Sequence, residues 1–138
     1  MIRALRSIAL VVRDYDEAIA WYVGVLGFRL VEDTPGAGGK RWIVVAPNGG
    51  GATLILARAA NEAQSSRVGD QTGGRVFLFV ESDDFGADFA RLRDAGVRFV
   101  EGPRREAYGE VAVFLDLYGN KWDLIGPAPT VPTPGGSS

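Results

Sequence analysis

The 138-residue sequence contains no cysteine and no histidine. Without cysteine the chain cannot form disulfides, thiolate nucleophiles, zinc fingers or iron–sulfur clusters. Without histidine it lacks the commonest metal ligand and the side chain that most often transfers protons near neutral pH. A Ser-His-Asp hydrolase is therefore excluded, together with most of the common metal centres.

Long apolar runs and an excess of one charge are also missing. No stretch approaches the roughly 18 apolar residues that a membrane span requires. The first apolar run ends at Arg13-Asp14 with no small-residue cleavage pattern after it, so we expect no signal peptide and a cytoplasmic protein. Fifteen basic and seventeen acidic side chains leave a formal charge of −2, which does not favour nucleic acid or an anionic membrane as a partner.

What is present is typical of a single globular domain, 46% hydrophobic and 10% aromatic. A strand rich in β-branched residues is predicted over 7–12. Asp14 fits a helix N-cap, Glu17 completes a capping box, and Gly27 occupies the position of a C-terminal cap. Further strands are expected over 28–31, 41–46 and 52–57, with turns over 34–39 and 47–51.

The second half of the chain repeats this order with a shift of about 69–70 residues. A strand is predicted over 75–81, and a helix runs from a cap at 82–84 to Gly96. Strands follow over 97–100, 111–115 and 121–125, and we expect Gly102-Pro103 to break the chain after the first of them.

Each half therefore reads β-α-β-β-β, and one such unit alone would expose a face of its sheet. The prediction is an α+β fold of two βαβββ modules, over 1–60 and 75–126. A polar linker is expected over 61–74 and a disordered Pro/Gly/Ser-rich tail over 127–138.

Short motifs at matching places in the two units point to a family. The first unit contains Ala18-Ile19-Ala20-Trp21-Tyr22 and Leu26-Gly27-Phe28; the second ends in Asp116-Leu117-Tyr118-Gly119-Asn120-Lys121-Trp122-Asp123-Leu124. Arg41-Trp42 and Tyr108-Gly109 also fit. With the repeat, these motifs resemble the vicinal oxygen chelate superfamily, which includes glyoxalase I, extradiol dioxygenases, and fosfomycin and bleomycin resistance proteins. The resemblance implies a curved mixed sheet that forms an open cup, with the helices on the outside.

The resemblance also implies where a metal would bind in the metal-dependent members. Their two histidines fall on Ser7 and on Phe77 (or Val76), and their glutamate falls on Asp123. A catalytic divalent ion normally needs about three protein donors. Ser7, Thr53 and Asp123 would make a poor oxygen site, so we expect no metal and no cofactor.

Strand alternation predicts what lines the cup instead. If Ser7 points inward, so does Ala9, and Phe77 and Phe79 share the opposite wall. Tyr108, Trp42 and Phe114 are further wall or rim candidates, and their rings offer contact area to a planar ligand. The alternative is that these rings only fill the core. The predicted ligand-binding residues are Ser7, Ala9, Arg41, Trp42, Phe77, Phe79, Tyr108, Phe114 and Asp123.

Asp123 is either a solvated or hydrogen-bonded carboxylate at the rim or a ligand contact. A buried unpaired carboxylate is costly, so we expect a partner, and Arg41 is the candidate that would orient a polar ligand group with it. Asp123 is also the candidate catalytic residue, with Glu110 or Tyr108 as alternatives.

Three functions follow from these expectations. The favoured one is a metal-free binding protein of the bleomycin resistance type, holding a planar or hydrophobic ligand, such as an antibiotic, without chemistry. The second is an enzyme, either a lyase or dioxygenase with an atypical metal site or a metal-free acid–base catalyst using Asp123. The third is a regulatory module with a filled cup. The resemblance and the prevalence of two-fold symmetry also predict a homodimer.

Overall fold

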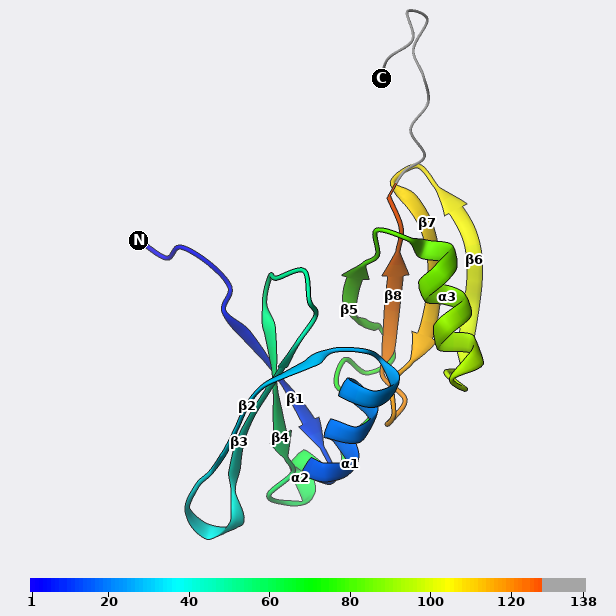
Figure 1. Cartoon of the computed structure of the whole chain (residues 1–138). Helices are drawn as coiled ribbons and strands as arrows, with labels where there is room; N and C mark the ends of the chain where they lie inside the picture. Colours follow the sequence, from blue (N-terminus) through cyan, green and yellow to red (C-terminus); the bar gives the residue numbers. More distant parts are fainter. Residues whose placement is uncertain (128–138) are drawn as a thin grey trace, which may run out of the picture. The chain divides into compact units, whose positions relative to one another are not determined.

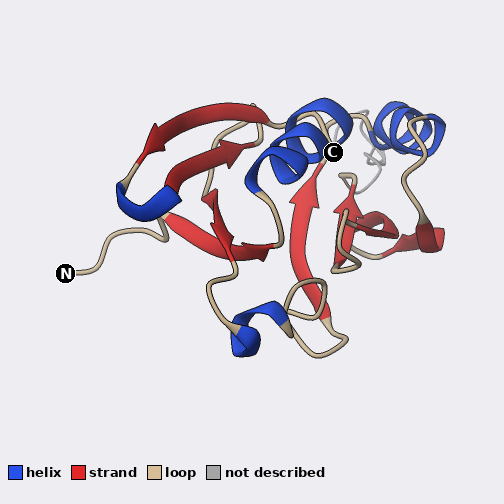
Figure 2. Ribbon diagram, turned by 90° about the horizontal axis from the view of Figure 1, so that it is seen from below, coloured by secondary structure: helices blue, strands red, loops and turns tan. Residues whose placement is uncertain are grey.

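The computed structural model describes residues 1–127, so nearly all of the tail predicted over 127–138 lies outside the described residues. The chain divides into two compact units. The first unit comprises Met1–Gly74 and the turn Leu117–Asn120; the second comprises Arg75–Asp116 and the chain from Lys121 onward. Figure 2 shows strands in both units, connected by loops and short helices.

The first unit contains one four-stranded sheet with helical segments (Figure 1). Its strands lie in the order β1-β4-β3-β2, with β1 parallel to β4 and the other pairs antiparallel. The elements are β1 (Ser7–Val12), α1 (Tyr15–Ile19), the π-helical turn η1 (Ala20–Val25), β2 (Arg29–Pro35), the 3-10 turn η2 (Ala37–Gly39), β3 (Arg41–Ala46), β4 (Thr53–Arg58) and α2 (Glu62–Ser65).

The second unit repeats this topology, with strands in the order β5-β8-β7-β6 and β5 parallel to β8. Its elements are β5 (Val76–Glu81), α3 (Phe85–Asp94), β6 (Phe99–Glu106), β7 (Gly109–Leu115) and β8 (Lys121–Ile125). The predicted α+β fold of two βαβββ modules is confirmed.

Both longer helical segments begin at an aspartate N-cap and end at a glycine. The Asp14 side chain accepts a hydrogen bond from the backbone N–H of Glu17 at 2.8 Å, and Asp84 does the same for Ala87 at 3.2 Å. Each cap satisfies a donor that the first helical turn leaves free. The chain leaves the first helical segment through Gly27 at φ 91° and the second through Gly96 at φ 89°. These left-handed conformations favour glycine, as predicted.

The core of each unit lies between its sheet and its longer helical segment. In the first unit, Leu10 and Val12 are fully buried on the face of β1 opposite Ala9, as alternation predicted. In the second unit, aromatic rings fill this layer. Phe89 of α3 lies 4.5 Å from Phe99 between ring centroids, and Phe114 stacks at 5.9 Å on Trp122.

The predicted break at Gly102-Pro103 is wrong. The strand continues through both residues as β6, which runs beside β7 with register shifts between Phe99 and Glu101 and between Glu101 and Arg104. β6 is the edge strand of its sheet, and a proline is tolerated there because its missing N–H can face away from the ladder.

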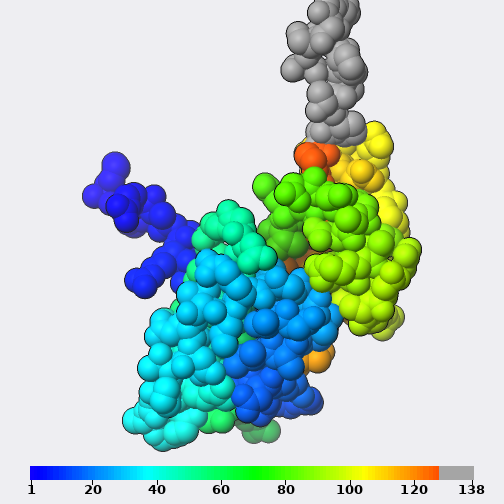
Figure 3. Space-filling view, in the orientation of Figure 1, coloured from blue at the N-terminus to red at the C-terminus, as the bar shows by residue number. Residues whose placement is uncertain are grey.

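Residues 1–6 are exposed and project from the first unit as an extended segment (Figure 3). Within residues 1–127, the helices are too short and too polar to span a bilayer.

Candidate functional site

Four side chains form a row across the second sheet, one from each strand. Phe79 of β5 is in register with Asp123 of β8, Asp123 with Val113 of β7, and Val113 with Glu101 of β6. Residues in register on neighbouring strands share a face, so the row places a ring, a carboxylate, an apolar group and a second carboxylate side by side. An adjacent row on the same face contains Glu81, Ile125, Val111 and Arg104. We call these eight residues the Phe79 face.

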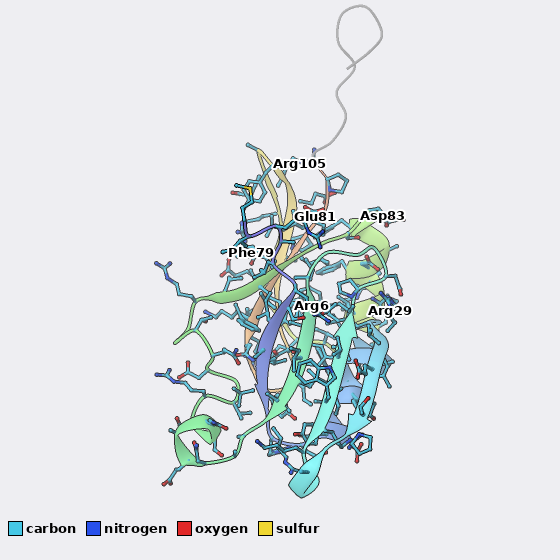
Figure 4. The ribbon with its side chains drawn as sticks, turned by 90° about the vertical axis from the view of Figure 1, so that its left-hand side faces the viewer. Arg6, Arg29, Phe79, Glu81, Asp83 and Arg105 are labelled. Atoms are coloured by element: carbon cyan, nitrogen blue, oxygen red, sulfur yellow. The ribbon has the colours of Figure 1, made fainter. Side chains whose placement is uncertain are left out.

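Phe79 is the exposed aromatic of this face. Its side chain is 63% exposed, whereas Val111 and Val113 on the same face are buried. Figure 4 labels Phe79 together with Glu81, two residues further along β5. A phenyl ring that remains in solvent beside buried apolar side chains offers a flat contact surface for another ring.

Asp123 is buried beside this ring. The residue is 6% exposed, and its Oδ1 atom has no hydrogen-bond partner within residues 1–127. Desolvation raises the pKa of the Asp123 carboxyl; the charge of Arg104 opposes this shift and that of Glu101 adds to it. A buried carboxylate oxygen without a donor is costly, so this feature calls for an explanation beyond packing.

The cation whose charge acts on Asp123 is already engaged. The Arg104 guanidinium donates to Glu101 Oε1 at 3.1 Å and lies 3.7 Å from Glu106 Oε1. Arg104 therefore influences Asp123 through its charge while its ion-pair contacts are with residues of its own strand.

The corresponding face of the first sheet presents small side chains. Ala9 is exposed, and the hydroxyls of Ser7 and Thr53 hydrogen bond to one another at 2.7 Å. Trp42 lies on the same face of this sheet as Val44 and is 48% exposed. Ser7, Ala9 and Trp42 therefore share one face, and the hydroxyls of Ser7 and Thr53 on it are paired with each other.

Arg41 lies on the opposite face of the first sheet, where it pairs with carboxylates of its own unit. Its guanidinium donates to Asp33 at 2.7 and 3.2 Å and to Asp16 at 2.8 Å, and lies over the ring of Tyr15. These carboxylates raise the pKa of Arg41 and Arg41 lowers that of Asp33. The physical reason is alternation: Arg41 and Trp42 are consecutive in one strand and cannot point to the same face.

Three other predicted residues, Phe114, Phe77 and Tyr108, lie in three different environments. Phe114 is fully buried between Phe99 and Trp122, so it belongs to the core and not to a wall. Phe77 lies at the register shift between Val76 and Leu78, where its ring meets Trp122 edge-on at 6.1 Å. This bulge takes Phe77 out of simple alternation with Phe79. Tyr108 lies in the turn between β6 and β7 and is 56% exposed.

The donor set does not fit the divalent ion of the metal-dependent relatives. Ser7 and Thr53 are hydroxyls bonded to one another, Phe77 offers no donor, and Asp123 is the single carboxylate at the expected positions. Over residues 1–127, no group of three or more acidic side chains could hold a metal ion.

Sequence reasoning did not identify Glu81, Glu101 and Arg104 as parts of this face. Glu81 could have been found, because it stands two residues after Phe79 on one strand. Glu101 and Arg104 could not, because the register shifts of β6 break the two-residue period that alternation relies on.

Comparisons with known proteins agree with this fold. Residues 4–124 match the family model of the Glyoxalase/Bleomycin resistance protein/Dioxygenase superfamily. An uncharacterized protein of Shewanella frigidimarina (strain NCIMB 400) is 53% identical over 127 residues, covering 91% of this chain and 94% of that one.

Two solved structures from Streptomyces sp. CB03234 are similar. TnmS3, an antibiotic binding protein, is 33% identical with a TM-score of 0.75, over 92% of this chain and 98% of that chain. A glyoxalase/bleomycin resistance protein is 32% identical with a TM-score of 0.70, over 88% of this chain and 99% of that chain.

Proposed function

Because the chain belongs to the Glyoxalase/Bleomycin resistance protein/Dioxygenase superfamily, as a member without the family's metal-ligand histidines, we propose that it is a binding protein for a planar, hydrophobic small molecule. The ligand would lie against the Phe79 face and be held by ring contact and shape. The similarity to an antibiotic binding protein supports a natural-product ligand of the antibiotic type.

The exposed ring of Phe79 is the observation that supports this proposal best. This exposed ring lies on a face whose valines are buried, in register with the buried Asp123. Stacking of a ligand ring on an exposed side-chain ring contributes about 0.5–1.5 kcal/mol beyond area burial. A ligand ring stacked on Phe79 would cover this exposed surface.

Titration with 1-methoxypyrene, a planar fluorophore without a hydrogen-bond donor, tests the proposal. We expect saturable binding, detected by quenching of tryptophan emission, and recovery of the unaltered probe by mass spectrometry. Phe79→Leu should weaken binding about three- to tenfold, since it removes the ring and keeps an apolar side chain. Tyr108→Leu, at another exposed ring of the second unit, is the matched control and should retain wild-type affinity. Equal losses of affinity in both variants would contradict the proposal.

Buried Asp123 favours a second candidate function, metal-free acid–base catalysis. Its raised carboxyl pKa is the property of a group that exchanges protons with a bound substrate. Chemical conversion of a bound compound that is lost in Asp123→Asn, with binding retained, would establish this function in place of simple sequestration.

We also propose that the protein works as a cytoplasmic homodimer, by analogy with its family and the general preference for two-fold pairs. Light scattering during size-exclusion chromatography should give twice the mass of one chain, and a monomeric mass at high concentration would contradict this.

A further inference from the structure

The buried, unpartnered oxygen of Asp123 indicates that the ligand of this face offers more than an apolar ring. A face that bound ligands by ring contact alone would need no carboxylate beneath it, because removing a charge from water is costly without a donor. Asp123 Oδ1 has no such donor within residues 1–127, and because the residue is only 6% exposed, water does not replace it. An unsatisfied buried group of this kind calls for an explanation, and a bound molecule that donates to it is one.

The neighbouring side chains of Asp123 limit which groups could donate a hydrogen bond to its carboxylate. On one side it is in register with Phe79, and on the other with Val113, neither of which can donate a side-chain hydrogen bond. The Arg104 guanidinium donates to Glu101. The exposed neighbour is Phe79, so a molecule that covers this ring is the one that comes next to the carboxylate.

We infer that the ligand is a planar aromatic molecule with an O–H or N–H donor at its ring edge, which hydrogen bonds to Asp123 while the ring lies against Phe79. This inference rests on the proposed function and names the ligand class for the same site. A hydroxyl or amine donor to a carboxylate forms a charge-assisted bond, which is stronger than a bond between neutral groups. Ligands without the donor leave the carboxylate buried and unpaired, so the face selects against them.

A matched pair of probes separates the donor from the ring. 1-Hydroxypyrene and 1-methoxypyrene share the same four-ring system, and only the first can donate a hydrogen bond. The wild-type protein should bind 1-hydroxypyrene at least about tenfold more tightly at neutral pH. 1-Pyrenemethylamine carries a charged donor, and comparison with 1-hydroxypyrene shows whether a cation or a neutral group fits the site better.

Two variants link the preference to Asp123. Asp123→Leu removes the acceptor and should abolish the preference for 1-hydroxypyrene while binding of 1-methoxypyrene is retained or improved. Asp123→Asn keeps an acceptor oxygen without the charge and should reduce the preference by a smaller factor. Thermal unfolding of both variants verifies folding, and Asp123→Asn is sufficient for the test if the leucine variant does not fold. Asp83→Asn, at an exposed carboxylate of the second unit outside the Phe79 face, is the control and should keep the preference.

The outcomes distinguish the two proposals. If 1-methoxypyrene binds as tightly as 1-hydroxypyrene, the inference about the donor is wrong and the proposed binding function stands. If the preference persists in Asp123→Leu, the donor is recognised elsewhere and the inference is also wrong. If neither probe binds, the proposed function fails and this inference fails with it.

Discussion

The hydroxyl of Tyr118 donates a 2.7 Å hydrogen bond to Glu17 Oε2, joining residues 101 positions apart in the sequence. Tyr118 lies in the turn between β7 and β8, yet this turn belongs to the first unit. Glu17 also accepts from Arg13, so α1, the end of β1 and the turn are linked through one carboxylate. Burial and the bond to Glu17 raise the pKa of Tyr118 to about 12, which keeps the hydroxyl protonated as a donor.

Tyr118→Phe should lower the free energy of unfolding by about 1 kcal/mol, because it deletes this hydrogen bond and leaves the Glu17 oxygen with one donor fewer. Urea denaturation at neutral pH measures the change. Tyr108→Phe removes a hydroxyl from a solvent-exposed turn and should change stability by less than about 0.5 kcal/mol. Equal effects of the two variants would show that the Tyr118 contact contributes nothing specific.

Asp123→Asn should raise the free energy of unfolding by about 1 kcal/mol at neutral pH, because the native state no longer buries an unpaired charge. The effect has a defined pH dependence. The native carboxyl has a raised pKa, so the folded state holds the proton more tightly than the unfolded state does. The wild-type protein therefore gains stability as the pH falls through the folded pKa, and the gain is complete below the unfolded pKa of about 3.9.

The stability difference between wild type and Asp123→Asn should accordingly be largest at neutral pH and shrink in acid. Denaturation at a series of pH values measures it, and taking the difference cancels the other titrating groups. Glu81→Gln, an exposed carboxylate on the same face, serves as the control and should give a difference near zero at each pH. A difference that grows in acid would mean that Asp123 is stabilised as the anion.

Much of the architecture could be predicted from short-range rules. Asp14 and Gly27 bounded the first helical segment because caps depend on local backbone geometry, and Leu10 was placed in the core because a regular strand alternates. Phe114 was misplaced because an alternation pattern defines two faces without showing which one the helix covers. Glu101 and Arg104 were missed because bulges in β6 depend on pairing with β7, which no local pattern encodes.

Arg41→Ala should destabilise the protein and leave binding of 1-methoxypyrene unchanged. The guanidinium bridges Asp16 and Asp33 and covers the ring of Tyr15, so its loss removes two ion pairs and a cation–π contact on the face opposite Trp42. Because Arg41 lowers the pKa of Asp33, its contribution is present above the unfolded pKa of Asp33 and is lost as the pH falls through the folded pKa. Thermal unfolding and probe titration measure the two effects separately. Weaker probe binding by a fully folded Arg41→Ala variant would show that Arg41 takes part in ligand binding.

Gly69→Ala should be the most damaging small substitution in the segment between the two repeats. Gly69 has a φ of 79°, and a Cβ at this position would lie 1.9 Å from the backbone oxygen of Tyr118. Backbone cannot yield as a flexible side chain does, so the substitution must displace the turn that bonds Glu17. Gly73 has a similar φ of 69°, but a methyl group there would meet nothing within 4 Å, so Gly73→Ala carries only the conformational cost of about 1–2 kcal/mol. Urea denaturation should therefore show a clearly larger loss of unfolding free energy for Gly69→Ala than for Gly73→Ala. The double variant Gly69→Ala with Tyr118→Phe should lose less than the sum of the two single losses, because both substitutions act on the same turn. Equal losses for the two alanine variants, or strict additivity in the double variant, would mean that the close approach of Gly69 to Tyr118 does not anchor the turn.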